Sequence, residues 1–342
     1  MSDLNMGTSD SRTAKIWHKK LNMDVYKDSF FTSKFISKSG DGIIQEFEDL
    51  TKAKGDKITI GIVARGDDGY LPSGTKVDGN EEDLITFNDD VTVDEKNFGI
   101  ANSSMISEQR AFYDMPDTMY NSLTQRAAEK MDKEYFTALD TTNTICLYKT
   151  AGTLTATSTI ATAVNAVTAA DKISPETLTD IKPMLVTGFN RRVYPVKPVR
   201  VDGQYFWVVL VHSDALSDWE NDTTIQQARR EALNRGKDNP IFTGAWAVWN
   251  QFIIFAHENI GIGSNTSSIP YAKCHILGQG ALASAWAKRP TVEAKKPAYT
   301  SQEKGWGYFS IFGVIKPQYN AYDFGSVNLV VARRALSNIT IS

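Results

Sequence analysis

The amino-acid sequence predicts an α+β fold in which a long acidic β-hairpin is followed by one long helix. Residues 58–62 alternate apolar with small or polar side chains, the pattern of a half-buried strand, and a strongly acidic segment follows them. Residues 117–140 carry apolar side chains at every fourth position, as in a long helix. Residues 205–211 form a continuous apolar run, which is typical of a strand buried on both faces.

Composition indicates a folded protein without the features of an exported one. The chain has 342 residues, of which 42% are hydrophobic and 23% charged, ordinary values for a soluble domain. Its two cysteines, Cys146 and Cys274, make neither a disulfide framework nor a zinc knuckle, so we expect a reducing compartment and two buried thiols. The N-terminus lacks a signal-peptide pattern, and no apolar run is long enough to span a membrane. A pI near 5.9 argues against general nucleic-acid affinity.

The N-terminal residues predict an arm that folds onto something else. Residues 1–40 have seven basic and four acidic side chains, which give a net charge of +3. Their apolar residues are too many for a disordered tail and too scattered for a core. Residues 43–50 then place apolar side chains at helical spacing, which predicts a short helix.

Residues 55–100 predict a long hairpin whose loop is strongly acidic. The window 66–95 contains ten carboxylates and one lysine, Lys76, so its charge is −9 while the rest of the chain sums to +6. Pro72 and glycine-containing turn pairs interrupt this window, and residues 84–93 return as strands. The carboxylates are Asp67, Asp68, Asp78, Glu81, Glu82, Asp83, Asp89, Asp90, Asp94 and Glu95.

Three interpretations of this acidic flap remain open: a solvated loop, a loose calcium site, or a docking element for a basic surface of another subunit. EF-hand spacing fails because Asp83 stands where that loop needs glycine. Three basic clusters could receive the flap, since complementary charge sets specificity and register; phosphate binding is their alternative role. The candidate intersubunit residues are Asp67, Asp68, Asp78, Glu81, Glu82, Asp83, Arg191, Arg192, Arg229, Arg230, Arg333 and Arg334. Lys197 and Arg200 accompany the first basic pair, and Arg235 and Lys237 the second.

The middle of the chain predicts strands followed by a capped helix. Residues 141–162 contain nine threonines, a composition that favours strands and turns. Ser174 and Pro175 make a good helix start, as N-cap and first helical residue. Gly188 is expected to end this helix, and Pro183 to kink it.

The second half of the chain predicts two more helices and several strands. Residues 214–233 are expected to be helical, and so are the alanine-rich residues 281–287. Strands are expected at residues 246–255, 271–277, 307–315 and 327–332. The closing strands must pair with strands formed earlier in the chain.

The sequence offers no convincing pattern for catalysis, cofactor binding or metal ligation. Gly278, Gly280 and Ala283 match the G-x-G-x-x-A turn of dinucleotide sites, but no second strand with a ribose-binding acid follows, so a tight strand-to-helix turn is the simpler interpretation. The histidines lack metal-ligand spacing; they are His18, His212, His257 and His275. No serine nucleophile motif occurs, and Cys274 and its neighbour His275 point to opposite faces of a strand. We therefore predict no catalytic residue, no cofactor and no metal site.

The order of these elements resembles the major capsid proteins of tailed bacteriophages, which have the Hong Kong 97-type capsid fold. That fold has an N-terminal arm, an extended hairpin called the E-loop, a long spine helix, an axial (A) domain and a peripheral (P) domain. The segments that look like the family are residues 205–214, 239–258, 277–286 and 306–334. The resemblance implies an arm at 1–54, an E-loop at 55–100, spine helix and P-domain at 101–170, an A-domain at 171–285 and returning P-domain strands at 286–342.

The resemblance also implies a function. It implies a structural subunit, not an enzyme, that self-assembles into hexamers and pentamers of an icosahedral shell around double-stranded DNA, within the virion and after assembly in the host cytoplasm. The implied partners are other copies of the chain, DNA contacted without sequence specificity, and separate scaffold, portal and decoration proteins, with no membrane. Two alternatives remain: an encapsulin-type bacterial compartment, which shares the fold, and a nucleotide-binding enzyme built on residues 278–283.

Overall fold

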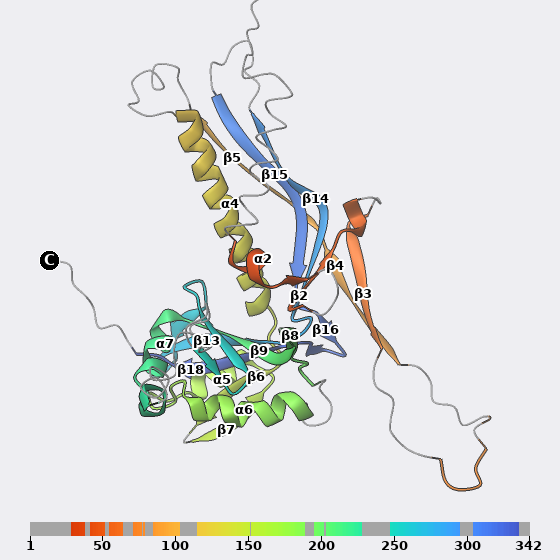
Figure 1. Ribbon diagram of the computed structural model, residues 1–342, viewed down its shortest axis with the longest axis vertical. Coiled ribbons are helices and arrows are strands. Elements are labelled where there is room, and N and C mark those ends of the chain that lie inside the picture. Colours follow the sequence, from red (N-terminus) through yellow and green to blue (C-terminus); the bar gives the residue numbers. More distant parts are fainter. Residues whose placement is uncertain are drawn as a thin grey trace, which may run out of the picture.

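The fold is built on two sheets joined by one long helix, as the computed structural model shows (Figure 1). A five-stranded sheet lies at one end and a nine-stranded sheet with most of the helices at the other, while a hairpin projects from the side. The structure describes residues 29–37, 42–51, 55–63, 71–76, 78, 85–102, 115–150, 152–188, 195–201, 203–227, 247–294 and 304–334.

The five-stranded sheet is assembled from segments far apart in the sequence. Its strands, in spatial order, are β1 (Ile36–Ser37), β2 (Ile44–Phe47), β14 (Leu282–Ala294), β15 (Lys304–Ile315) and β5 (Asp94–Asn102). The pairs β14–β15 and β15–β5 are antiparallel, whereas β1–β2 and β2–β14 are parallel. The expectation that closing strands pair with earlier ones is confirmed for this sheet.

Helix α4 (Met115–Asp140) runs along this sheet, as the four-residue periodicity predicts (Figure 1). Its buried stripe, which includes Leu123, Ala127 and Met131, packs against Trp286 and Phe312. The rings of Trp286 and Phe312 are stacked with their centroids 4.7 Å apart. Because the stacked rings and the α4 side chains belong to one buried cluster, α4 and the sheet form one packed unit.

The nine-stranded sheet combines the middle of the chain with its last strand. Its path is β10 (Ala247–Trp249), β11 (Phe252–Ala256), β9 (Gln204–Val211), β13 (Pro270–Leu277), β18 (Ser326–Ala332), β6 (Cys146–Thr150) and β7 (Thr153–Thr157). Two short strands lie off this path: β8 (Val199–Val201) pairs with β9, and β12 (Ile262–Ser264) pairs with β13. Parallel pairing of β18 with β6 brings the end of the chain beside the strand that follows α4.

Strand β9 is buried on both faces from Trp207 to Val211, as its continuous apolar run predicts, whereas Tyr205 at the start of the run is exposed. Trp207, Val209 and Val211 join a core that includes helix α6 (Pro175–Thr187) and helix α7 (Ser213–Glu220). Val208 and Leu210 point to the other face, into a second core. That second core includes Tyr135, Phe136 and Leu139 of α4 and Phe31 of helix α2 (Phe30–Lys34). The sheet therefore lies between helices, with α4 shared by both sheets.

The helix ends follow the local signals. Ser174 caps α6 by accepting a hydrogen bond from the Thr177 amide, and Gly188 ends it with φ 78°. Pro183 lies inside α6, and the helix continues through it to Thr187. The remaining described elements are α5 (Ile160–Ala166), the 3-10 turn η1 (Asp49–Thr51) and the small hairpin of β16 (Gln318–Tyr319) and β17 (Tyr322–Asp323).

Two predicted helices are wrong. Most of residues 43–50 lie in β2 and η1, and residues 282–287 lie in β14. In β14, Leu282 and Trp286 pack toward α4 while Ala283 and Ala285 pack toward the projecting hairpin. This period of two is that of a strand, although alanine by itself favours a helix. Of the helix expected at 214–233, α7 ends at Glu220, residues 223–227 form one further helical segment, and 228–233 lie outside the described residues.

The sheets divide the chain differently from the expected domain boundaries. Strands β6 and β7 fall within residues 101–170, and β18 within 286–342, yet all three belong to the nine-stranded sheet. Strand β14 begins at Leu282, before the expected boundary at 285. The assignment of the A-domain and P-domain names to these two sheets stays a prediction.

Candidate intersubunit contact surfaces

The acidic window lies on a two-stranded hairpin that projects away from both sheets (Figure 1). Strand β3 (Lys57–Val63) pairs antiparallel with β4 (Thr86–Thr92) in a continuous register, from Lys57 opposite Thr92 to Val63 opposite Thr86. The predicted hairpin is therefore confirmed, and the described residues 71–76 lie at its far end (Figure 1).

Among the described residues, the hairpin is anchored to its own subunit near its base. Ile60 and Val91 are buried there against the small side chains of Ala283 and Ala285 in β14. Small residues in β14 allow this close approach, which explains why alanines occupy that face of the strand. Beyond Ile60 the strand loses its buried pattern, so the outer half of the hairpin has little support from its own subunit.

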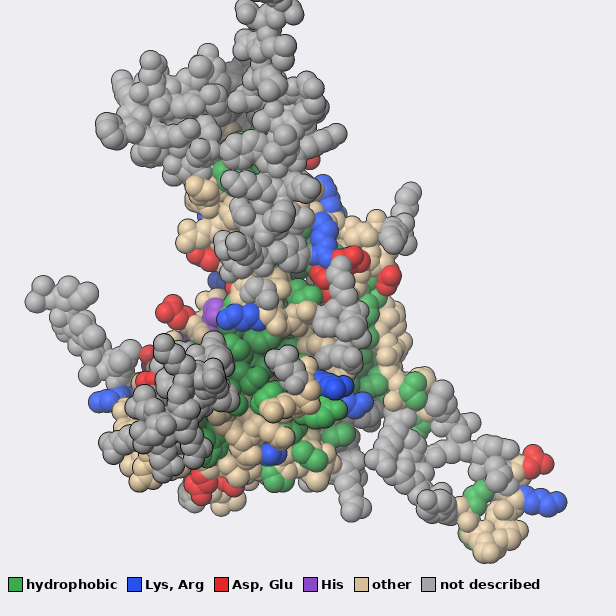
Figure 2. Space-filling view, viewed as in Figure 1, with side chains coloured by type: hydrophobic (Ala, Val, Ile, Leu, Met, Phe, Trp, Pro, Cys, Tyr) green, Lys and Arg blue, Asp and Glu red, His purple; other side chains and the backbone are tan. Residues whose placement is uncertain are grey.

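The outer half of the hairpin exposes large apolar side chains. Val63 is 58% exposed, Ile85 47% and Leu71 40%. These three belong to the six exposed large hydrophobic residues among the described part of the chain. Figure 2 shows hydrophobic, basic and acidic side chains together at the far end of the hairpin. Exposed apolar residues grouped on a projecting element mark an interaction surface.

Few of the predicted acidic contact residues can be placed. Asp67, Asp68, Glu81, Glu82 and Asp83 lie outside the described residues. Asp78 is described and exposed. Their role as contacts stays a prediction.

Of the six arginines predicted as contacts, the structure describes Arg333 and Arg334. The predicted residues that lie outside the described ranges are Arg191, Arg192, Arg229 and Arg230. Arg333 donates from Nη1 to Oδ2 of Asp214 at 2.6 Å, and the backbone N–H of Arg334 donates to Asp218 at 2.9 Å. An arginine that already pairs with a carboxylate of its own chain is a weaker candidate for receiving the flap of another copy. Lys197 and Arg200, from the first cluster, are exposed.

The N-terminal arm is fastened by a carboxylate that sequence reasoning missed. The buried side chain of Asp132 accepts hydrogen bonds from the Ser29 hydroxyl at 2.7 Å, the Phe30 amide at 2.9 Å and the Phe31 amide at 3.3 Å. These are the first amides of α2, where a negative charge is favoured. A signal was present, because Asp132 interrupts an apolar series between Ala128 and Phe136, four residues away on each side.

An aromatic cluster completes the docking of this segment. Phe31 is fully buried, and its ring centroid lies 4.9 Å from that of Phe136 and 5.1 Å from that of Tyr135. His257 lies 4.9 Å from the Phe30 ring and 4.6 Å from the Phe136 ring. Burial lowers the pKa of His257, because the charged imidazolium is poorly solvated there. The prediction that the N-terminal part folds onto another element is confirmed for residues 29–37: residues 29–35 pack on α4, and residues 36–37 pair with β2.

The glycine turn at residues 278–280 is structural. Its backbone amides donate to carbonyl oxygens of the same chain: Gly278 to Gly325 at 2.7 Å, Gln279 to Lys197 at 2.8 Å and Gly280 to Gly42 at 3.0 Å. A pyrophosphate site needs free amides at a helix N-terminus, and this turn leads into strand β14. The turn cannot serve as a dinucleotide site.

The described histidines and both cysteines have structural surroundings. His212 caps α7, since its Nδ1 accepts from the Asp214 amide at 3.1 Å, and buried His275 lies 3.4 Å from a carboxylate oxygen of Asp140. Burial raises the pKa of the Cys146 thiol to about 11 and of the Cys274 thiol to about 12, so neither is activated as a nucleophile. Within the described ranges, no group of three or more His, Cys, Asp or Glu side chains is arranged to hold a metal ion.

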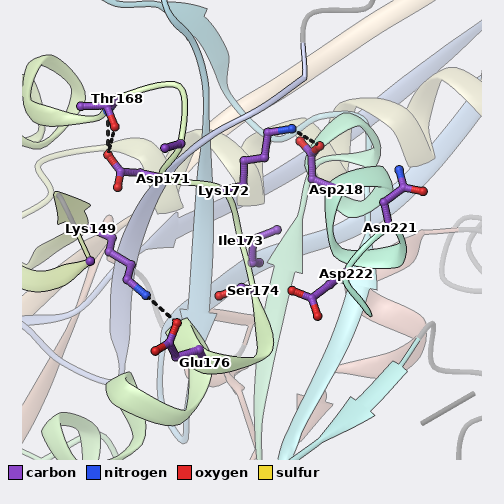
Figure 3. Close-up of a pocket in the computed structure, with 12 residues that line it drawn as sticks. Lys149, Thr168, Asp171, Lys172, Ile173, Ser174, Glu176, Asp218, Asn221 and Asp222 are labelled. Carbon is purple, nitrogen blue, oxygen red and sulfur yellow. Dashed lines mark hydrogen bonds and ion pairs between the residues drawn. The ribbon is translucent and has the colours of Figure 1, made fainter. Parts of the chain in front are cut away.

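A pocket of about 600 Å³ lies between the first turn of α6 and the end of α7 (Figure 3). Its charged groups pair with one another: Lys149 with Glu176 at 3.2 Å, and Lys172 with Asp218 at 2.7 Å. Asp171 accepts two hydrogen bonds from its own turn. Paired charges without an adjacent nucleophile and base give this pocket no catalytic constellation.

Comparison with known proteins identifies what this arrangement is similar to. A family model described as phage capsid protein matches residues 5–328. The major capsid protein of Pseudomonas phage KPP25 is 23% identical over 355 residues, covering 90% of this chain and 92% of that protein. The capsid of Ralstonia phage GP4 (20% identity, TM-score 0.74) and that of cyanophage Pam1 (21% identity, TM-score 0.77) each cover 91% of this chain and 93% of the other. These two structural similarities confirm the predicted fold.

No helix in the described part of the chain combines the length and the apolar character that a membrane crossing requires.

Proposed function

This chain belongs to the phage capsid protein family, and from that premise we propose that it is the major capsid protein of a phage. As a member of this family it is a structural subunit of a protein shell. In our proposal, copies of the chain form hexamers and pentamers that close into an icosahedral shell around double-stranded DNA. The driving force is burial of the hairpin on neighbouring copies.

The observation that carries this proposal is the projecting hairpin with its exposed apolar residues. A two-stranded hairpin is marginally stable in water by itself. Here Val63, Leu71 and Ile85 stay exposed beyond a base that is anchored by Ile60 and Val91. A second copy of the chain can cover these side chains and supply basic groups for the carboxylates around them. The hairpin is thus one half of an intersubunit contact.

The partners follow from the same proposal. Copies of the chain contact one another. Packaged DNA meets the inner surface without sequence readout, and only weakly, because a net charge of −3 gives little electrostatic attraction to phosphates. Scaffold, portal and decoration proteins are separate chains. Assembly takes place in the host cytoplasm and the product is the virion. The subunit carries no catalytic group and no cofactor in this proposal.

The encapsulin alternative differs in cargo, because an encapsulin shell encloses enzymes. The family match is to phage capsid proteins, so we favour a shell that encloses DNA. Nucleic acid inside purified particles supports the capsid, whereas protein cargo without nucleic acid supports the compartment.

Charge reversal in the flap tests the docking role. Changing Glu81, Glu82 and Asp83 together to lysine should leave the subunit folded and impair assembly, because like charges then face the basic receiving surface. The matched control replaces them with glutamine, glutamine and asparagine, which keeps their size and is expected to weaken assembly less. Negative-stain electron microscopy and sedimentation report the outcome. Normal particles from the lysine variant would show that the flap does not dock by charge.

A further inference from the structure

Within the described part of the acidic window, Asp89 is distinguished by a hydrogen bond to a segment outside the hairpin. It lies on β4 and is half-buried, and its Oδ2 accepts the backbone N–H of Gln318 at 2.8 Å. The next residue, Asp90, points to the opposite face of the strand, is exposed, and accepts a hydrogen bond from the Thr59 hydroxyl at 2.7 Å. Asp89 therefore faces the body of the subunit, and Asp90 faces away from it.

Gln318 connects Asp89 to the segment that follows α4. Its side-chain Nε2 donates to the carbonyl oxygen of Thr142 at 2.8 Å and to Oδ1 of Asp323 at 2.8 Å. Thr142 is the second residue after the end of α4, and Asp323 lies on β17. The hairpin is thus tied, through one residue, to the point where the long helix meets the nine-stranded sheet.

This connection point is held rigidly. Lys316 and Asp323 form an ion pair at 3.0 Å, with side chains only 3% and 1% exposed. Lys316 Nζ also donates to the Thr142 carbonyl at 3.3 Å and to Asn143 Oδ1 at 2.8 Å, and Asp323 Oδ2 accepts the Thr144 amide at 2.9 Å. A buried network in which the polar groups are satisfied has a single favourable geometry.

The apolar contacts at the hairpin base do not fix the angle between the hairpin and the body of the subunit as firmly as this network does. Ile60 and Val91 pack on Ala283 and Ala285, and such burial is non-directional, so it holds the base in place but resists swivelling weakly. A hydrogen bond to a carboxylate is directional and charge-assisted. Burial, and then the nearby charge of Asp89, raise the pKa of Tyr319 to about 12, which agrees with a carboxylate held against β16.

We propose that Asp89 is a positioning residue: through Gln318 it fixes the angle at which the hairpin leaves the subunit, and so the curvature with which copies join. The effect on shell curvature rests on the proposed shell function, whereas the angle of the hairpin is a property of the single subunit. Removing the acceptor should let the hairpin swivel about its base. Copies would then join at variable angles and form shells of mixed size or open sheets.

The experiment compares three variants of the full chain. Asp89→Ala removes the acceptor, Asp89→Asn keeps an acceptor oxygen without the charge, and Asp90→Ala removes a carboxylate that faces away from the body. In unassembled subunits, spin labels at Ser73→Cys on the hairpin and Asp180→Cys on α6 report the distance between the two elements. The native cysteines are buried and should not be labelled.

We expect a broader distance distribution for Asp89→Ala, and a distribution like that of the parent chain for Asp89→Asn and Asp90→Ala. In electron micrographs, Asp89→Ala should give mixed diameters where the parent gives one. A narrow, unshifted distribution for Asp89→Ala, with its thermal midpoint unchanged, overturns the proposal. A distribution for Asp90→Ala as broad as that for Asp89→Ala overturns it too, because the loss of a carboxylate that faces away from the body would then have the same effect. If the parent forms no shells, the shell function fails, while the distance distributions still decide the positioning role.

Discussion

Gly313 is the residue at which a single methyl group should separate the hairpin from the five-stranded sheet. It lies in β15, opposite Ala285 of β14, and close to Thr92 and Val93, where β4 ends and β5 begins. A Cβ built on Gly313 would lie 1.9 Å from the carbonyl oxygen of Thr92 and 3.2 Å from the Cα of Val93. Both neighbours are backbone, so no side-chain rotation can relieve the clash.

The size of the effect follows from this geometry. Ordinary van der Waals contact begins at 3.4 Å, so the two backbones must move apart by about 1.5 Å in the Gly313→Ala variant. Overpacking a closely packed site typically costs about 1–3 kcal/mol, and a backbone clash lies at the upper end of that range. Gly61→Ala is the matched control, because its Cβ would meet nothing closer than the Phe87 carbonyl at 3.8 Å. We expect that control to change stability by less than about 0.5 kcal/mol.

The assay is thermal or denaturant unfolding of the purified subunit, together with proteolysis of the hairpin. Gly313→Ala should lower the unfolding midpoint and make residues of the hairpin more accessible to protease, whereas Gly61→Ala should do neither. An unfolding midpoint for Gly313→Ala equal to that of Gly61→Ala would refute the close approach of β15 to the hairpin base.

Two further predictions concern buried charge and pH. The pKa of His257 in the folded protein is depressed below its ordinary value of 6.5, so the unfolded chain binds more protons between these two pKa values. Stability should therefore fall as the pH drops below about 6.5. His257→Gln should flatten this part of a plot of thermal midpoint against pH, and an unchanged slope would contradict the docking of His257 among aromatic rings. Lys316→Met leaves the Asp323 carboxylate buried without its cation and should cost about 3–5 kcal/mol. Adding Asp323→Asn should recover part of this loss. Thermal unfolding measures both variants, and a Lys316→Met variant with the same unfolding midpoint as the parent chain would contradict the buried ion pair.

The parts of the fold that local patterns determine could be predicted from the sequence. The alternation of Ile58, Ile60 and Ile62 predicted β3, and the repeat of apolar residues predicted α4. Ser174 and Gly188 marked the ends of α6 because capping depends on neighbouring backbone groups alone. Recognition of the fold came from the order of such elements along the chain.

The failures have a common physical cause. Residues 281–286 are fully buried, so both faces of the strand are apolar or small and the polar alternation that distinguishes a strand disappears. The roles of Asp132 and Asp89 depend on partners 103 and 229 residues away, Ser29 and Gln318. No local pattern separates an acid that faces inward from one that faces solvent, so the sequence alone does not distinguish Asp89 from the other carboxylates of the acidic window.

Cryo-electron microscopy of the purified parent chain tests the central claim most directly. If the chain is a capsid subunit whose hairpin docks on its neighbours, particles should be closed shells built from rings of six and five copies, with the residues around Val63 and Ile85 covered by an adjacent copy. Particles in which these residues remain uncovered, or a chain that stays monomeric at every concentration at which it is soluble, would contradict the account.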